Sequence, residues 1–204
     1  MIGRRRAPGP LVIGRALGGG AYLVGGAATL AAWRLLPRRS LAVLGRDGVY
    51  SVIWPLVPAL LAVAVPAAVR FDARLLERVS GRPRWTLRAR GLGLLAVVGA
   101  VVVAGSPYDA ATCARNLLIL VGGALVAASL LPASVAWVPI ALYPPCAWLL
   151  GTRTNEIHAA WAVPLRPAGD PLAWRVAVVV AMVGVVVHLV LGTRGGAGDD
   201  DLSR

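Results

Sequence analysis

Near the carboxyl end of the chain, residues 172–191 read LAWRVAVVVAMVGVVVHLVL, a run of twenty almost entirely apolar residues. Its only ionisable side chains are Arg175 and His188. A helix rises about 1.5 Å per residue, so these twenty residues match the ~30 Å hydrocarbon core of a bilayer. Inside lipid, a single segment satisfies its own backbone hydrogen bonds only as a helix. The stretch is therefore predicted to be a transmembrane helix.

Five more apolar stretches precede it, and none shows the two-residue alternation of a barrel strand. Their predicted bounds are 16–33, 49–69, 87–105, 116–131 and 133–150. The chain is 58% hydrophobic and 15% charged, with a mean hydropathy of +0.73, whereas soluble domains are about 45–50% apolar and about 25% charged. This composition excludes a soluble globular domain. We predict an all-α fold: a polytopic transmembrane helical bundle of about six spans within residues 16–192.

The distribution of arginine predicts the orientation of this bundle. All 21 basic residues are Arg, and the formal net charge is +12. With the N-terminus in the cytoplasm, thirteen of them lie on the cytoplasmic side and eight outside, which agrees with the positive-inside tendency. We expect a multi-pass protein of a bacterial cell membrane, with a basic cytoplasmic segment (1–15) and a disordered cytoplasmic tail (193–204). No segment is long enough for a folded basic domain, so no nucleic-acid partner is expected.

The connection between the second and third stretches carries an amphipathic pattern. Residues 71–79 read FDARLLERV, and Gly81 and Pro83 follow. One helical face collects the apolar residues, which are Phe71, Leu75, Leu76 and Val79. The pattern predicts a short cytoplasmic helix, which either docks on a soluble partner or lies on the lipid headgroups.

Two other segments are predicted from turn, cap and small-residue signals. Between the fifth and sixth stretches, Asn155 and Pro164 predict the beginning and end of a short outer helix.

In the first stretch, Gly18, Gly19 and Gly26 form a small-residue face for close helix packing, within the chain or between two subunits. Prolines in the second and fifth stretches either open a path by kinking the helices or only shape their packing.

No pattern in the sequence points to catalysis or to a bound metal. G-x-S-x-G, H-E-x-x-H and P-loop motifs are absent from the sequence. The two histidines, His158 and His188, are far apart, and the two cysteines form no C-x-x-C pair. We therefore predict no enzymatic activity, no cofactor and no metal. Cys113, expected in the outer loop before the fourth span, and Cys146 are predicted not to form a required disulfide. His188 lies within a predicted span, and is either a functional ionisable group or a neutral, hydrogen-bonded side chain.

The order of these elements resembles the membrane (permease) subunit of type-two ATP-binding-cassette exporters. The resemblance rests on six spans with cytoplasmic termini, on the helix after the second span and on the outer segment after the fifth. The stretches RNLLIL from Arg115 and AWAVPLRPAG from Ala160 also look like small actinobacterial membrane proteins described as such permeases. In that family the helix after the second span couples to a separate ATPase, and by position the matching residues are Phe71, Arg74, Leu75, Leu76, Glu77 and Arg78.

The resemblance implies a function and a set of partners. The chain would be an exporter subunit that moves an unknown substrate, with a soluble nucleotide-binding ATPase and a second membrane subunit as partners in the bilayer. Two alternatives remain open at this stage. One is an accessory or immunity-type membrane protein without transport activity of its own. The other is an ion-coupled secondary carrier, which is disfavoured because no carboxylate lies within a predicted span.

Overall fold

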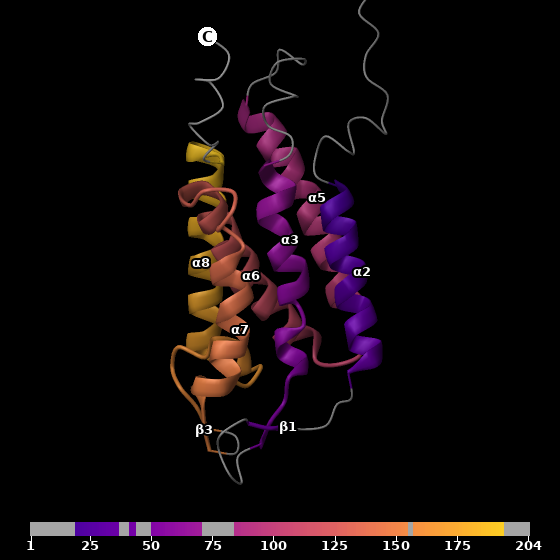
Figure 1. Cartoon of the computed structure of the whole chain (residues 1–204), viewed down its shortest axis with the longest axis vertical. Helices are drawn as coiled ribbons and strands as arrows, with labels where there is room; N and C mark the ends of the chain where they lie inside the picture. The colour runs from indigo at the N-terminus through magenta and orange to yellow at the C-terminus, as the bar shows by residue number, and fades with distance from the viewer. Residues whose placement is uncertain (1–18, 37–40, 44–49, 71–83, 155–156, 194–204) are drawn as a thin grey trace, which may run out of the picture.

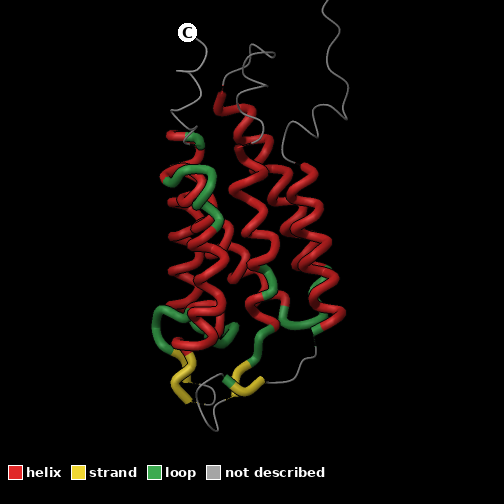
Figure 2. Tube along the Cα trace, in the orientation of Figure 1, coloured by secondary structure: helices red, strands yellow, loops and turns green. Residues whose placement is uncertain are grey.

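The computed structural model describes residues 19–36, 41–43, 50–70, 84–154 and 157–193. This part of the chain is mostly helical and forms an elongated bundle (Figures 1 and 2). Its α-helices, in chain order, are α2 (Gly19–Leu35), α3 (Ala59–Arg70), α5 (Arg84–Ala104), α6 (Ala110–Leu130), α7 (Val138–Gly151) and α8 (Pro171–Leu191).

Successive helices run in opposite directions along the bundle (Figure 1). The end of α3, the beginning of α5 and the end of α8 therefore lie at the same end, at the top of Figure 1. We call it the Arg84 end. Two short hairpins lie at the opposite end, which we call the hairpin end (Figure 2).

Three helices are long and apolar enough to cross a membrane: α6, α8 and the part of α5 from Trp85 to Ala104. The outward side chains of α8 are themselves apolar and exposed; they include Val179, Met182, Val183, Val186 and Val190. A continuous apolar surface is unfavourable in water and favourable against lipid chains. The prediction of a helical membrane protein is therefore supported by both the length of these helices and their exterior.

The other three helices are shorter than the ~20 residues that a perpendicular span needs. They comprise 17 residues in α2, 12 in α3 and 14 in α7. A 3-10 turn, η1 (Trp54–Leu56), precedes α3, and α7 contains Pro144 and Pro145. That all six helices cross the membrane completely therefore remains a prediction.

The structure corrects the predicted second span. A helix was expected from residue 49, but strand β2 (Tyr50–Ser51) pairs antiparallel with β1 (Leu41–Ala42), with Leu41 opposite Ser51. The α-helix begins only after Pro58. Proline lacks a backbone N–H and restricts the residue before it, so the prolines at 55 and 58 favour a turn and a late helix start.

The prediction of a short outer helix after the fifth span is wrong. Strands β3 (Thr152–Thr154) and β4 (Ile157–His158) form an antiparallel hairpin, and the 3-10 turn η2 (Val163–Leu165) follows. The β-branched residues Thr152, Thr154 and Ile157 are stiff at χ1 and favour extended backbone. That preference outweighs the weak capping signal at position 155.

The fourth helix begins six residues earlier than predicted, at Ala110 instead of Asn116. The side chain of Asp109 caps it by accepting hydrogen bonds from the backbone N–H groups of Ala111 and Thr112. Cys113 consequently lies within α6 and not in an outer loop, and it is buried. This helix is the centre of the bundle: 61% of its span is buried, against 17% for α8.

Candidate functional site

Helices α6 and α8 touch through their backbones at two glycines. A Cβ atom at Gly122 would lie 2.6 Å from the carbonyl oxygen of Val180 and 2.7 Å from the Cα of Ala181. A Cβ at Gly184 would in turn collide with the backbone of Gly122. Only glycine allows this approach, so the two helices form one closely packed pair.

The first helix of the described part packs through glycines in the same way. A Cβ at Gly25 would lie 3.0 Å from the Cβ of Ala64 on α3, and one at Gly26 would lie 2.9 Å from Cγ1 of Val98 on α5. Gly19 is buried, and Gly18 lies outside the described residues. The small-residue face predicted at Gly26 is therefore used for packing within the chain.

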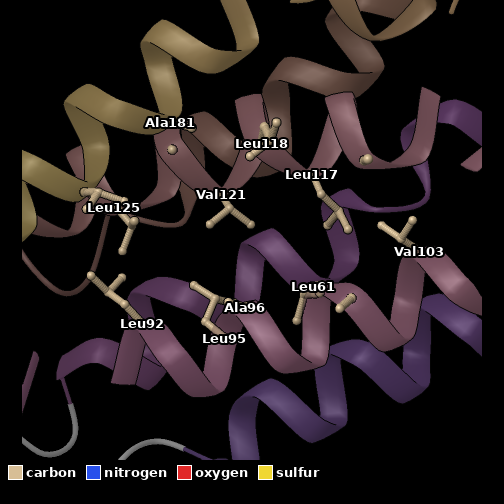
Figure 3. A pocket seen from close by; sticks show the side chains of 15 residues that line it. Leu61, Leu92, Leu95, Ala96, Val103, Leu117, Leu118, Val121, Leu125 and Ala181 are labelled. Carbon is tan, nitrogen blue, oxygen red and sulfur yellow. The ribbon is translucent and has the colours of Figure 1, made fainter. Parts of the chain in front are cut away.

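A cavity of about 380 Å³ separates α5 from α6 and α8. In Figure 3, Leu92 and Ala96 of α5 face Val121 and Leu125 of α6 across it, and Leu61 of α3 lies beside them. All its lining residues are Leu, Val, Ala or Gly. Helix α5 contacts α2 more extensively than it contacts either α6 or α8, and the cavity interrupts its contact with those two helices.

Two nitrogen-containing side chains lie at the Arg84 end, just beyond this cavity. Nη1 of Arg88 donates a hydrogen bond to the carbonyl oxygen of Leu189, at 2.8 Å, near the end of α8. His188, on the last turn of α8, is only 3% exposed. The Nε of Arg88 and the Nδ1 of His188 are buried and have no hydrogen-bond partner. The sequence left open whether His188 is a functional ionisable group or a neutral side chain that forms a hydrogen bond. Its Nδ1 atom forms none.

A second polar cluster lies within α6 towards the hairpin end, centred on Arg115 and Asn116. Both side chains are completely buried. Nε and Nη2 of Arg115 donate to Oδ1 of Asn116 at 3.2 and 3.1 Å, and Nδ2 of Asn116 donates onward to backbone carbonyls. The carbonyl acceptors of the two side chains belong to Pro55, Pro164, Arg166 and Pro167.

This Arg115 cluster has the features of a structural clamp. The acceptors in this cluster are all neutral: besides Oδ1 of Asn116, they are backbone carbonyls of the 3-10 turns and the loop that cover the hairpin end. A buried polar group is tolerated only when it is hydrogen-bonded, and here nearly every donor has an acceptor. The cluster therefore fixes η1 and η2 onto α6 and leaves little donor capacity for a ligand.

Charged side chains near the hairpin end form hydrogen bonds and an ion pair with neighbours in the sequence. Asp170 caps α8 and forms an ion pair with Arg166. Burial alone would raise the pKa of Asp170, but hydrogen bonds from the N–H groups of Ala173 and Leu172 and the charge of Arg166 lower it. Burial, and then the charge of Arg166, lower the pKa of His158. At neutral pH this region therefore holds an ionised Asp170 and an uncharged His158.

The residues predicted to dock on an ATPase, Phe71, Arg74, Leu75, Leu76, Glu77 and Arg78, lie outside the described residues. Within the described part, no group of three or more His, Cys, Asp or Glu side chains gathers as metal ligands would. Three features were not predicted from the sequence: the contact of Arg88 with α8, the position of Gly99 in the wall of the cavity, and the Arg115 cluster. A helical spacing of three to four residues from Arg88 through Leu92, Leu95 and Gly99 was the signal for the first two.

Comparisons of the chain with protein-family models, with curated proteins and with solved structures gave no match.

Proposed function

We propose that the chain is the membrane subunit of an exporter of the ATP-binding-cassette type, which crosses the membrane six times and takes its energy from a separate soluble ATPase. The observation that carries the proposal is the alternation of the six helices. Because α3 ends and α5 begins at the Arg84 end (Figure 1), residues 71–83 connect two helices at the end where α8 also finishes. A coupling helix needs this placement, on the same side as the C-terminal segment.

The charge distribution supports a cytoplasmic position for the Arg84 end. The segments that the proposal places in the cytoplasm carry thirteen of the 21 Arg residues, and seven of these lie between Arg70 and Arg90. Arginine close to spans favours the cytoplasmic side. The arginines among residues 71–83 would lie beside an ATPase surface.

The loose contact around the cavity supports a moving part. Transport requires at least two arrangements of the spans, and close backbone contacts such as Gly122 with Gly184 resist separation. The contact between α5 and the α6–α8 pair is interrupted by the cavity, so movement of α5 relative to this pair breaks few close contacts. We propose that α5 moves against α6 and α8 during the transport cycle.

Co-purification in a mild detergent tests the proposal. The tagged full chain is expressed with its neighbouring genes, and the eluate is examined for an ATPase that carries a Walker motif. The double change Leu75→Asp with Leu76→Asp places two charges on the predicted apolar face and should abolish co-purification. The matched change Ala73→Asp with Ser80→Asp adds the same charge off that face and should keep it.

Two outcomes distinguish the alternatives. An ATPase that co-purifies equally with both double variants would contradict the assignment of residues 71–79 as the coupling helix. A chain that purifies with no ATPase at all would contradict the exporter proposal and favour an accessory membrane protein.

A further inference from the structure

The cavity between α5, α6 and α8 has the lining of a site for hydrocarbon. Its walls carry only aliphatic side chains and glycine, so water inside it would find too few polar partners. Three lining residues, Ala96, Ala100 and Leu118, are also exposed on the outside of the bundle. The cavity thus opens sideways between α5 and α6, onto the surface that faces the lipid chains.

The cavity is about as long as one leaflet of a bilayer. Its lining on α5 runs from Leu92 to Val103, and eleven steps of about 1.5 Å make roughly 16 Å. Half of the ~30 Å hydrocarbon core is ~15 Å. Seven residues before Leu92, towards the Arg84 end, Trp85 is 63% exposed, and an exposed Trp at the end of a span marks the headgroup level.

Arg88 lies between that level and the cavity. It is one helical turn before Leu92, on the stripe of α5 that continues through Leu95 and Gly99. On α8, His188 follows the lining residues Ala181 and Val185 on the same stripe. Among the described residues, no carboxylate pairs with Arg88, and the buried Nδ1 of His188 has no partner. Within the described residues, the apolar cavity therefore ends at a positive charge that has no acidic partner.

We propose that an anionic phospholipid binds at this site, with one acyl chain in the cavity and its phosphate beside Arg88 and His188. A guanidinium matches the geometry of a phosphate and forms charge-assisted hydrogen bonds with it. The site selects a lipid of net negative charge because a zwitterionic lipid carries its own cation next to the phosphate. This inference does not depend on the exporter proposal, since the site lies within one chain and involves no ATPase.

Photo-crosslinking of lipid to the purified full chain tests the site. The protein is reconstituted into phosphatidylcholine vesicles that contain a trace of phosphatidylglycerol with a diazirine midway along one acyl chain. A parallel sample contains phosphatidylcholine with the same diazirine. After illumination, mass spectrometry should locate the adducts in residues 92–103 of α5 and 114–125 of α6. The phosphatidylglycerol probe should label more strongly than its phosphatidylcholine counterpart.

Two kinds of variant separate the acyl chain from the headgroup. Gly99 lines the cavity and has free space at its Cβ position, so Gly99→Leu should fill the cavity and reduce labelling by both lipids. Gly93, on the same helix, also has free space but does not line the cavity. Gly93→Leu is therefore the matched control and should label normally. Ala96→Phe narrows the exposed opening and provides a second blocking variant that leaves the core unchanged.

The headgroup part rests on Arg88. Arg88→Gln should reduce the preference for phosphatidylglycerol by roughly tenfold, because a charge-assisted hydrogen bond contributes about that factor to binding. Arg88→Lys keeps the charge and should keep most of the preference. Equal labelling by the two lipids in the wild-type chain would overturn the proposal. So would adducts confined to the exposed face of α8, or labelling that neither Gly99→Leu nor Ala96→Phe reduces, since another occupant would then fill the cavity.

Discussion

Replacing Gly122 with alanine should separate α6 from α8 and destabilise the bundle. The new Cβ would lie 2.6 Å from the carbonyl oxygen of Val180, whereas ordinary contacts begin at 3.4 Å. The three atoms nearest to it all belong to the backbone of α8, which has no rotamer to change. The helices must therefore move apart by about 0.8 Å, the difference between 2.6 and 3.4 Å. Overpacking of this kind typically costs about 1–3 kcal/mol.

A second glycine on a neighbouring helix provides the control for this substitution. Gly93→Ala meets nothing within 4 Å, and alanine favours a helix by up to about 1 kcal/mol relative to glycine. Because both substitutions gain the same helix preference, the difference between them reports the collision alone. For a domain of this size, 1–3 kcal/mol corresponds to roughly 2–12 °C in Tm.

Thermal unfolding in detergent, followed by circular dichroism at 222 nm, measures this difference. We expect Gly122→Ala to unfold several degrees below Gly93→Ala, and Gly184→Ala to behave like Gly122→Ala because its new Cβ collides with the backbone of Gly122, on the other side of the same contact. If Gly122→Ala and Gly93→Ala unfold at the same temperature, the close packing of α6 against α8 is wrong.

Three further predictions concern single side chains. Arg115→Met keeps the volume but leaves loop carbonyls without donors, so it should lower the free energy of unfolding by about 2–5 kcal/mol, measured by the same unfolding assay. Cys146→Ala should leave Tm unchanged because Cys146 is exposed, while Cys113→Ala should lower it modestly because Cys113 is buried; a change of wild-type gel mobility on reduction would contradict the assignment of both as free thiols. Hydrogen bonds from Thr112 lower the pKa of Asp109 in the folded chain. The contribution of the ionised Asp109 carboxylate to the free energy of unfolding is therefore fully present above the unfolded pKa of about 3.9, and it is lost as pH falls through the folded pKa. Asp109→Asn, which can still cap the helix, should therefore remove part of the acid sensitivity of unfolding.

The apolar stretches in the sequence predicted where helices form, because length and hydropathy are properties of a segment alone. Their ends were harder to predict. The fourth span was predicted to begin at Asn116, whereas α6 begins at Ala110. In the structure the polar residues Arg115 and Asn116 are inside α6, and their hydrogen-bond partners come from loops more than forty residues away along the chain. No local pattern reveals such partners.

The close contact of Gly122 with Gly184 and the cavity were also not predictable from the sequence. With 24 glycines in the chain, a single glycine at a helix contact does not stand out from the composition. The cavity depends on how α5 lies against two helices, and that position is set by packing between segments distant in sequence. The stripe from Arg88 to Val103 was readable from the 3.6-residue period, but the period alone does not show whether a neighbouring helix covers it.

Labelling of single cysteines from outside the cell reports whether the six alternating helices cross the membrane with residues 71–83 in the cytoplasm. Both native cysteines are first replaced by alanine. One variant then carries Ser80→Cys, between α3 and α5, and the other carries Ala160→Cys, at an exposed position near the hairpins. An impermeant maleimide applied to intact cells should label the cysteine at position 160 and label the one at position 80 only after the membrane is opened. Reaction at position 80 in intact cells, or at both positions from the same side, would contradict the account.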